Sequence, residues 1–245
     1  MSEIAGPDET LDLLCDEELK IIQKKKGYRF SIDAILLANF VSLKNGESLL
    51  DIGTGCGIIP IYMTKRGFQN PMTGVELQPG LFRVALKNKT ANECGNVEFL
   101  LCDVREGLKE MRENRFNVVV CNPPYTPKGS GRTSPDNSRH TARCESEFDL
   151  ALLLSLASSL LSSKGRFSLI YPSKRAGELL YKAKSHRLEP KRLRFIHPRE
   201  GEESNLFLAE FLKDGGTGTK VEKPLVIHKD RLYTGEVQSY YSLKR

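Results

Sequence analysis

The sequence has no apolar stretch close to the roughly 20 residues that a membrane-spanning helix needs. Its first residues are acidic at Glu3, Asp8 and Glu9, whereas a secretory leader starts with a basic region followed by an apolar run. Both absences argue against a membrane protein or a secreted protein, and we expect a soluble protein of the cytoplasm.

Patterns of metal ligands and of disulfides are missing as well. The six cysteines include no Cys-x-x-Cys pair, and several lie in strongly apolar runs, which is typical of reduced cysteines. The four histidines are not spaced with a cysteine pair as zinc ligands would be. We therefore expect no bound metal.

Positive charge is in moderate excess. The net charge is +6 and the isoelectric point about 8.9, which is compatible with a polyanionic partner without being diagnostic of one. Three basic clusters stand out, although any one of them is compatible with an ordinary solvated surface. They are residues 24–26 with Arg29, then Lys128, Arg132, Arg139 and Arg143, and finally residues 182–199.

From residue 47 onward, short β-like runs alternate with stretches of helical spacing. This is the pattern of a parallel sheet covered by helices on both faces. A chain of 245 residues with 39% hydrophobic side chains can bury one large core, so we expect a single α/β domain over residues 1–245. The predicted fold is a doubly wound, Rossmann-like, mostly parallel sheet of seven strands. The expected strands are 48–52, 72–75, 97–101, 116–121, 166–170, 188–196 and 206–212, and the expected helices are 58–66, 80–92, 104–112, 148–161 and 174–185.

Three segments lie outside this alternation. Residues 1–45 are expected to form a helical extension, in which Ser31 begins a helix. Residues 123–147 form a long loop rich in Pro, Gly, Ser and Arg, and loops of this length in compact domains are usually functional or disordered. Residues 214–245 are expected to be a C-terminal tail with one extended piece at 224–228.

Residues 49–60 read as a hydrophobic strand that enters a glycine-rich turn and then a helix. Gly53, Gly55 and Gly57 allow positive φ angles and let a ligand approach without meeting a Cβ. Asp51 favours one cofactor, because its carboxylate would repel a pyrophosphate and attract the ammonium and sulfonium groups of S-adenosylmethionine. An ATP-binding P-loop is excluded, since no Gly-Lys-Ser/Thr follows the turn.

Two further acids end the next two expected strands. Glu76 follows the glycines by about 20 residues, where an acid can accept hydrogen bonds from ribose hydroxyls. Asp103 ends the third strand, within reach of an adenine amino group in the predicted sheet. Asp51, Glu76 and Asp103 are therefore predicted to line one cofactor crevice, the alternative being that they only cap helices.

The strand at 116–121 runs directly into Asn122-Pro123-Pro124-Tyr125. The two prolines stiffen this corner, which presents the side-chain carbonyl of Asn122 and the main-chain carbonyl of Pro123 as acceptors. Tyr125 offers a flat face for stacking. Two acceptors that hold the hydrogens of a conjugated NH₂ group raise the electron density on its nitrogen, which favours methylation. The alternative is a proline turn that ends a strand and buries a tyrosine.

At these residues the chain resembles the class I methyltransferases that modify amino groups, over residues 46–215. Residues 23–37, together with 224–228 and 233–237, further resemble the bacterial tRNA (adenine-N6)-methyltransferases that act on the adenosine 3′ of the anticodon in a valine tRNA. The resemblance implies S-adenosylmethionine as cofactor, contacted also by Asn122, and tRNA as partner. No obligate protein partner is evident.

The resemblance also implies roles for side chains at the substrate. A base must leave its stack to enter such a pocket, so Asn122, Pro123 and Tyr125 are implied to contact a flipped adenine. Four basic residues are implied to bind backbone phosphates. They are Lys128, Arg132, Arg139 and Arg143.

Other interpretations stay open from the sequence. A glutamine amide is also a planar conjugated NH₂, so protein glutamine N5-methylation suits the same corner, as does an amino group of rRNA or DNA. A nicotinamide oxidoreductase shares the strand, glycine turn and helix, but the position of Asp51 and the glycine spacing fit it poorly. A non-catalytic RNA-binding module would not need the intact residues 122–125.

Overall fold

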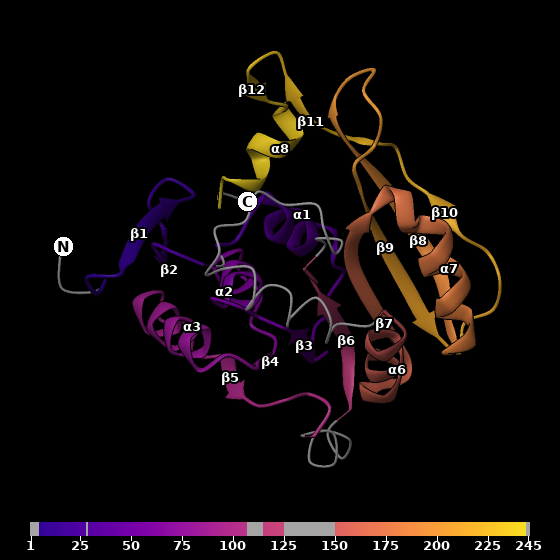
Figure 1. Ribbon diagram of the computed structural model, residues 1–245, viewed down its shortest axis with the longest axis horizontal. Helices are drawn as coiled ribbons and strands as arrows, with labels where there is room; N and C mark the ends of the chain where they lie inside the picture. Colours follow the sequence, from indigo (N-terminus) through magenta and orange to yellow (C-terminus); the bar gives the residue numbers. More distant parts are fainter. Residues whose placement is uncertain (1–4, 28, 107–114, 125–149, 244–245) are drawn as a thin grey trace.

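The computed structural model describes residues 5–27, 29–106, 115–124 and 150–243 of the chain (Figure 1). Its centre is a sheet of ten strands, ordered β12-β11-β8-β9-β7-β6-β3-β4-β5, with β10 paired to β8. The strands are β3 (Leu49–Ile52), β4 (Met72–Glu76), β5 (Val97–Leu101), β6 (Phe116–Cys121), β7 (Leu161–Pro172), β8 (Leu188–Arg199), β9 (Leu206–Lys213), β10 (Lys220–Val221), β11 (Leu225–Lys229) and β12 (Leu232–Tyr233).

The sheet is mostly parallel, as predicted. β3 is parallel to β4 and to β6, β5 is parallel to β4, and β7 is parallel to β6, while β9 runs antiparallel between β7 and β8. All seven expected strands are present, but the count of seven is wrong, because β10, β11 and β12 extend the sheet at β8. β10 and β12 have two residues each, which is too short for an alternating pattern in the sequence.

Helices cover both faces of the sheet, which confirms the doubly wound prediction. Buried apolar side chains form two clusters, and alternate residues of a strand enter different clusters: Val118 and Val120 of β6 belong to one, Val119 and Cys121 to the other. The expected helix at 104–112 lies mostly outside the described residues. The first cluster includes residues of α1 (Ile32–Phe40), α2 (Ile58–Lys65), α3 (Pro79–Ala91) and α8 (Gly235–Tyr240), and the second includes residues of α6 (Leu150–Leu160) and α7 (Ala176–Ser185), which follows a 3₁₀ turn at Ser173–Arg175.

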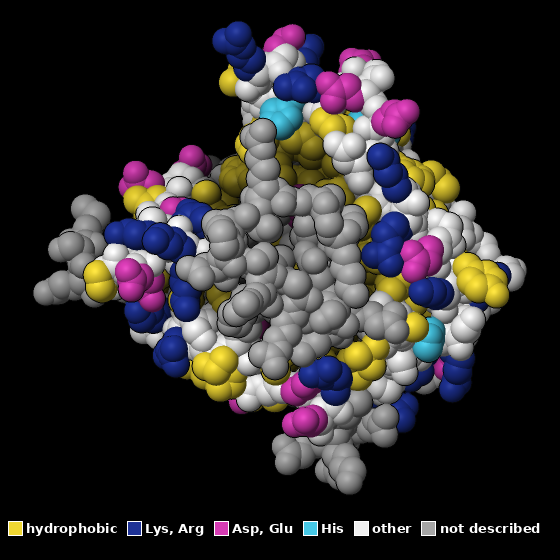
Figure 2. Space-filling view, in the orientation of Figure 1, with side chains coloured by type: hydrophobic (Ala, Val, Ile, Leu, Met, Phe, Trp, Pro, Cys, Tyr) yellow, Lys and Arg dark blue, Asp and Glu magenta, His cyan; other side chains and the backbone are white. Residues whose placement is uncertain are grey.

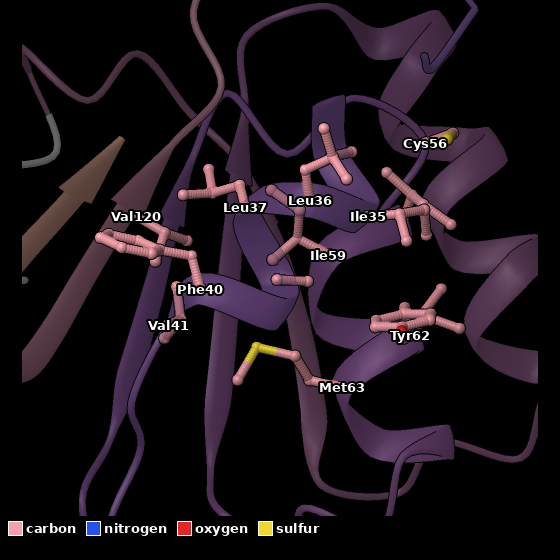
Figure 3. Packing of buried hydrophobic residues seen from close by; sticks show 14 of the residues in the cluster. Ile35, Leu36, Leu37, Phe40, Val41, Cys56, Ile59, Tyr62, Met63 and Val120 are labelled. Carbon is pink, nitrogen blue, oxygen red and sulfur yellow. The ribbon is translucent and has the colours of Figure 1, made fainter. Parts of the chain in front are cut away.

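The helix α1 is apolar almost all round because neighbours enclose it. It packs against α2, β7 and α8, and Ile35, Leu36 and Leu37 are at most 2% exposed. Figure 3 shows the side chains of α1 between the strands and α2, with Phe40 close to Val120 of β6. A helix that is apolar almost all round is a core element, and α1 anchors the segment that precedes the sheet.

The N-terminal segment is not the helical extension that we expected. β1 (Glu9–Leu14) and β2 (Leu19–Lys24) form an antiparallel hairpin, and α1 is the one helix in the described part of this segment. The chain reverses at residues 15–17, whose φ angles are 54°, 55° and 66°. Residues other than glycine rarely adopt this region, and the Asn-Gly or Asp-Gly pair that usually indicates a hairpin is missing from these residues. Ser31 takes the N-cap position of α1 without a side-chain capping hydrogen bond.

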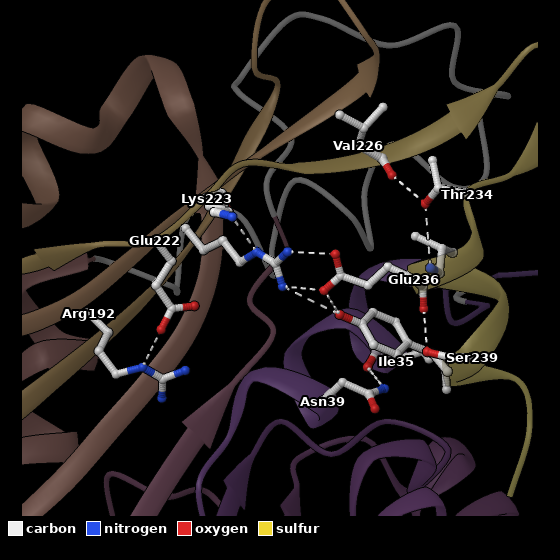
Figure 4. A network of polar contacts seen from close by, with 12 residues as sticks. Ile35, Asn39, Arg192, Glu222, Lys223, Val226, Thr234, Glu236 and Ser239 are labelled. Carbon is white, nitrogen blue, oxygen red and sulfur yellow. Dashed lines mark hydrogen bonds and ion pairs between the residues drawn. The ribbon is translucent and has the colours of Figure 1, made fainter. Parts of the chain in front are cut away.

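The C-terminal segment packs closely onto the domain, and the extended piece that we expected at 224–228 is present as β11. β11 lies parallel to β8, and Val237 of α8 is fully buried. In the network of Figure 4, Arg194 of β8 donates hydrogen bonds to both carboxylate oxygens of Glu236 at 2.7 and 2.8 Å. The hydroxyl of Tyr62 donates to the carbonyl of Tyr240 at 2.6 Å. No described helix is long and apolar enough to cross a membrane.

Candidate active site

Three of the predicted site residues meet at one edge of the sheet. The ends of β3, β4 and β6 are paired in parallel register. In this register Ile52 of β3 lies beside Val75 of β4 and beside Cys121 of β6. The next residues along the three strands are Gly53, Glu76 and Asn122. The glycine turn therefore lies between the acid that ends β4 and the asparagine that follows β6. This is the carboxyl edge of the strands, where open α/β sheets bind their ligands.

The glycine turn needs its glycines for two different reasons. Gly53, Gly55 and Gly57 have φ angles of 71°, 60° and 81°, which other residues rarely adopt. A Cβ on Gly57 would also lie 2.5 Å from the ring of Phe99, so this position has no room for a side chain. A Cβ on Gly53 would meet no atom within 4 Å, so the turn has an open side there.

Asp51 lies under this turn and is 1% exposed. The hydroxyl of Thr54 donates a hydrogen bond to one of its carboxylate oxygens at 2.7 Å. The other oxygen, Oδ1, is buried and accepts no hydrogen bond from the residues that the structure describes. Burial raises the pKa of Asp51 to about 7, and the nearby charge of Glu76 acts in the same direction. An unsatisfied buried acceptor is costly, and a cationic donor group would relieve it.

Glu76 stabilises the glycine turn through two hydrogen bonds. Its carboxylate accepts hydrogen bonds from the backbone N–H of Gly55 at 2.9 Å and of Gln78 at 2.8 Å. Burial raises the pKa of Glu76, although these N–H groups act in the opposite direction. Each carboxylate oxygen keeps a second lone pair for a ligand hydroxyl.

Asp103 lies two residues beyond β5 and forms a local turn. Its carboxylate accepts hydrogen bonds from the backbone N–H and the side chain of Arg105, both at 2.9 Å. The hydrogen bonds from Arg105 lower the pKa of Asp103, so this carboxylate is charged. These hydrogen bonds are local, and the predicted contact of Asp103 with an adenine stays a prediction.

The corner that begins with Asn122 lies on the other side of the glycine turn from Glu76. Asn122 is half-buried, Pro123 is buried and Pro124 is exposed. Tyr125 lies outside the described residues, so its stacking role stays a prediction. The same holds for the four predicted phosphate contacts, Lys128, Arg132, Arg139 and Arg143.

Two polar residues at the site escaped the sequence interpretation. Thr54 supplies the hydroxyl that Asp51 accepts. Asn88 of α3 donates to the carbonyl of Cys56, inside the glycine turn, at 2.9 Å. A polar residue between two glycines and an asparagine inside a helix are both weak local signals, since such residues usually favour caps and turns.

A surface cavity of about 610 Å³ lies at the opposite edge of the sheet, where the parallel strands begin. Two of its cations, Lys213 and Arg187, have partners within the protein. Lys213 donates to the carbonyls of Ser158 and Leu161 at 2.6 and 2.8 Å, at the C-terminal end of α6. Arg187 pairs with Asp214 at 2.6 Å. Cations at the C-terminal end of a helix offset the helix dipole, so this cavity is a structural feature, separate from the crevice.

The central part of the sequence matches a known family. Residues 43–204 match the family described as "Methyltransferase domain". This chain belongs to that family. The class I methyltransferase fold that we expected is thereby confirmed, and the interpretation as a nicotinamide oxidoreductase is excluded.

Individual relatives narrow the comparison. A tRNA1(Val) (adenine(37)-N6)-methyltransferase of Porphyromonas gingivalis is 30% identical over 82% of this chain and 80% of its own length. A protein of the same name from Aliivibrio salmonicida is 28% identical over 75% of this chain and 77% of its own length. In structure, an Agrobacterium tumefaciens protein described as a predicted O-methyltransferase superposes with a TM-score of 0.69 at 22% identity, over 85% of this chain and 95% of that chain, which supports the fold alone.

Proposed function

We propose that this protein uses S-adenosylmethionine to methylate the N6 amino group of an adenine in tRNA. Two independent observations support the proposal. The relatives carry this activity in their names. The corner that begins with Asn122 lies beside the glycine turn that follows Asp51. The observation that carries the proposal is the paired register of β3 and β6, which brings Asn122 next to Gly53. The names of the relatives favour the adenosine 3′ of the anticodon in a valine tRNA, and such a substrate implies work in the cytoplasm.

The residues of the turn fit the methyl donor. The unpartnered oxygen of Asp51 suits its ammonium group, and the open side of Gly53 leaves room for its approach. Glu76 would accept hydrogen bonds from the ribose hydroxyls, and Asp103 would face the adenine amino group. When bound, the donor supplies a methyl group on a positively charged sulfur.

The corner at Asn122 and Pro123 would act on the N6 amino group of the adenine, which is the nucleophile. The carbonyl oxygens of Asn122 and Pro123 would accept hydrogen bonds from the two N6 hydrogens, which weakens the conjugation of the nitrogen lone pair with the ring. The nitrogen gains the methyl group and then loses a proton to solvent, so no strong base is required. Rigid prolines keep the two acceptors in line with the donor turn, and this alignment lowers the entropic part of the activation barrier.

A transfer assay with unbiased substrates tests the proposal. The enzyme and labelled donor are incubated with separate pools of tRNA that lacks the modification, rRNA, DNA and protein, and each product is digested and identified. We expect the label as N6-methyladenosine in tRNA alone, with the Asn122→Ala protein as the inactive control. Label in protein glutamine, in rRNA or in DNA would reject the proposed substrate.

A further inference from the structure

The hairpin is attached to the rest of the domain by Asn88 of α3 and by Asn92, the residue that directly follows this helix. The side chain of Asn88 accepts from the N–H of Ile22 at 2.7 Å and donates to the carbonyl of Ile22 at 3.0 Å. Asn92, one helical turn later, forms the same pair of hydrogen bonds with Lys20 at 3.0 and 2.6 Å. Four helical residues rise by about 6 Å and two strand residues by about 6.6 Å, so the two spacings match. The asparagines thus complete the free edge of β2 as a neighbouring strand would.

Only the first of these asparagines reaches the glycine turn. Asn88 also donates to the carbonyl of Cys56 at 2.9 Å, and Cys56 lies between the second and third glycines of the turn. Asn88 is 0% exposed, so water cannot take over one of its hydrogen bonds without entering the core. The third hydrogen bond of Asn92 is instead with the carbonyl of Asn88 in α3, at 2.8 Å.

The strand β2 follows α3 in the opposite direction and ends at the edge of the sheet that carries the crevice. Lys20 lies beside Asn92 near the end of α3, whereas the ammonium of Lys24 packs against Gly80 in its first turn. β2 therefore lies along α3 from the end of this helix to its first turn.

We propose that Asn88 is a positioning residue of the donor site: it ties the carbonyl of Cys56 to β2, so that the docked hairpin and the donor-binding turn form one cooperative unit. The inference rests on the proposed donor site. Asn88 touches neither donor nor adenine, and it acts through the conformation of the turn. Linkage then requires that the docked hairpin strengthens donor binding and that the bound donor strengthens hairpin docking by the same factor.

Asn88→Ala and Asn92→Ala form a matched pair for the test. Each variant loses one pair of side-chain hydrogen bonds to β2. Only Asn88→Ala also loses the hydrogen bond to the carbonyl of Cys56 in the glycine turn. We expect Asn88→Ala to raise the Kd for S-adenosylhomocysteine and the KM for the donor about tenfold, because two carbonyls and one N–H are left without their buried partner. Asn92→Ala should raise both by less than about threefold. At saturating donor, kcat should stay within about twofold of the wild type in both proteins. Equal decreases of donor affinity in the two variants, or none in Asn88→Ala, would overturn the proposal.

Hydrogen exchange in the wild-type protein gives a second test, which does not depend on whether a variant folds. Saturating S-adenosylhomocysteine should slow exchange of the Ile22 and Lys20 amides, while amides of α7 on the other face of the sheet keep their rates. Binding of S-adenosylhomocysteine with unchanged hairpin exchange would overturn the coupling and leave the proposed function intact. If S-adenosylhomocysteine does not bind the wild-type protein, the proposed donor site itself fails.

Discussion

Two opposing effects act on the protonation state of Asp51. Its burial favours the neutral acid, whereas the ammonium group that we propose as its partner favours the charged form. The pKa of Asp51 rises from 3.8 in an exposed chain to about 7 in the folded protein. At a pH between these two values, Asp51 therefore takes up a proton when the protein folds. Ionising Asp51 therefore lowers the stability of the ligand-free protein progressively from about pH 4 to about pH 7, and the decrease is complete above that range.

Donor binding should carry the signature of this residue. We expect the affinity for S-adenosylhomocysteine to rise between about pH 5.5 and 7.5 and then to level off, because the bound ammonium requires ionised Asp51. Calorimetry over this range measures the effect, and the proton released on binding can be counted in buffers of different ionisation enthalpy. Asp51→Asn should bind more weakly at high pH and show no such rise. A rise of the same size in Asp51→Asn would assign the titration to another group.

Asn122 should separate catalysis from donor binding. We expect Asn122→Ala to lower kcat by about 10²–10³, since it removes a hydrogen bond that strengthens in the transition state. Its affinity for S-adenosylhomocysteine should change little, whereas Asp51→Ala and Glu76→Ala should weaken that affinity. Single-turnover rates and calorimetry on the same preparations give both quantities. An equal decrease of rate and of donor affinity in Asn122→Ala would contradict its action on the amino group.

At the scale of elements, the turn between β3 and α2 combines backbone strain with close packing. Gly57 and Gly46 have similar positive φ angles, 81° and 79°. An added Cβ meets the ring of Phe99 at Gly57 and no atom within 4 Å at Gly46. The two glycines therefore allow the strain and the collision to be measured separately.

We expect Gly46→Ala to lower the free energy of unfolding by about 1–2 kcal/mol, which is the cost of a left-handed conformation alone. Gly57→Ala should cost more, because the ring of Phe99 must move, and it should also weaken donor binding. Urea unfolding and calorimetry of both variants measure these effects. Equal destabilisation and unchanged donor affinity would show that the turn tolerates the side chain.

The elements that sequence reasoning found are those whose signals are local. The strand, glycine turn and helix around Asp51 follow one another directly within residues 49–65, and Pro79 begins α3 as its fixed φ angle suggests. The hairpin was missed because its turn uses left-handed residues at 15–17 without glycine. Its free edge is completed by Asn88, which is 66 positions away from Ile22 in sequence, and no local pattern indicates a hydrogen bond over such a separation.

At the scale of the whole molecule, most described arginines near the crevice already have acidic partners. Figure 2 shows Lys and Arg side chains interspersed with Asp and Glu on one face. Four arginine ion pairs lie at this edge of the sheet and on the hairpin. They are Arg29 with Asp12, Arg105 with Asp103, Arg175 with Glu178 and Arg199 with Glu202. The net positive charge of the sequence is therefore larger than the unpaired arginine charge that these surfaces present to RNA. The basic cluster from Lys128 to Arg143 is the first one to test for tRNA binding.

We expect the combined substitutions Arg132→Glu, Arg139→Glu and Arg143→Glu to weaken tRNA binding and to flatten its salt dependence. The slope of log K against log salt should fall in magnitude by about 0.7–0.9 for each phosphate that the protein no longer neutralises. Lys164→Glu, at the edge of the sheet where the parallel strands begin, serves as the control and should leave the slope unchanged. Binding measured from low to moderate salt distinguishes the outcomes. If the triple variant keeps the wild-type affinity and slope, phosphate binding by this cluster is wrong, and a protein amide becomes the better candidate for the substrate.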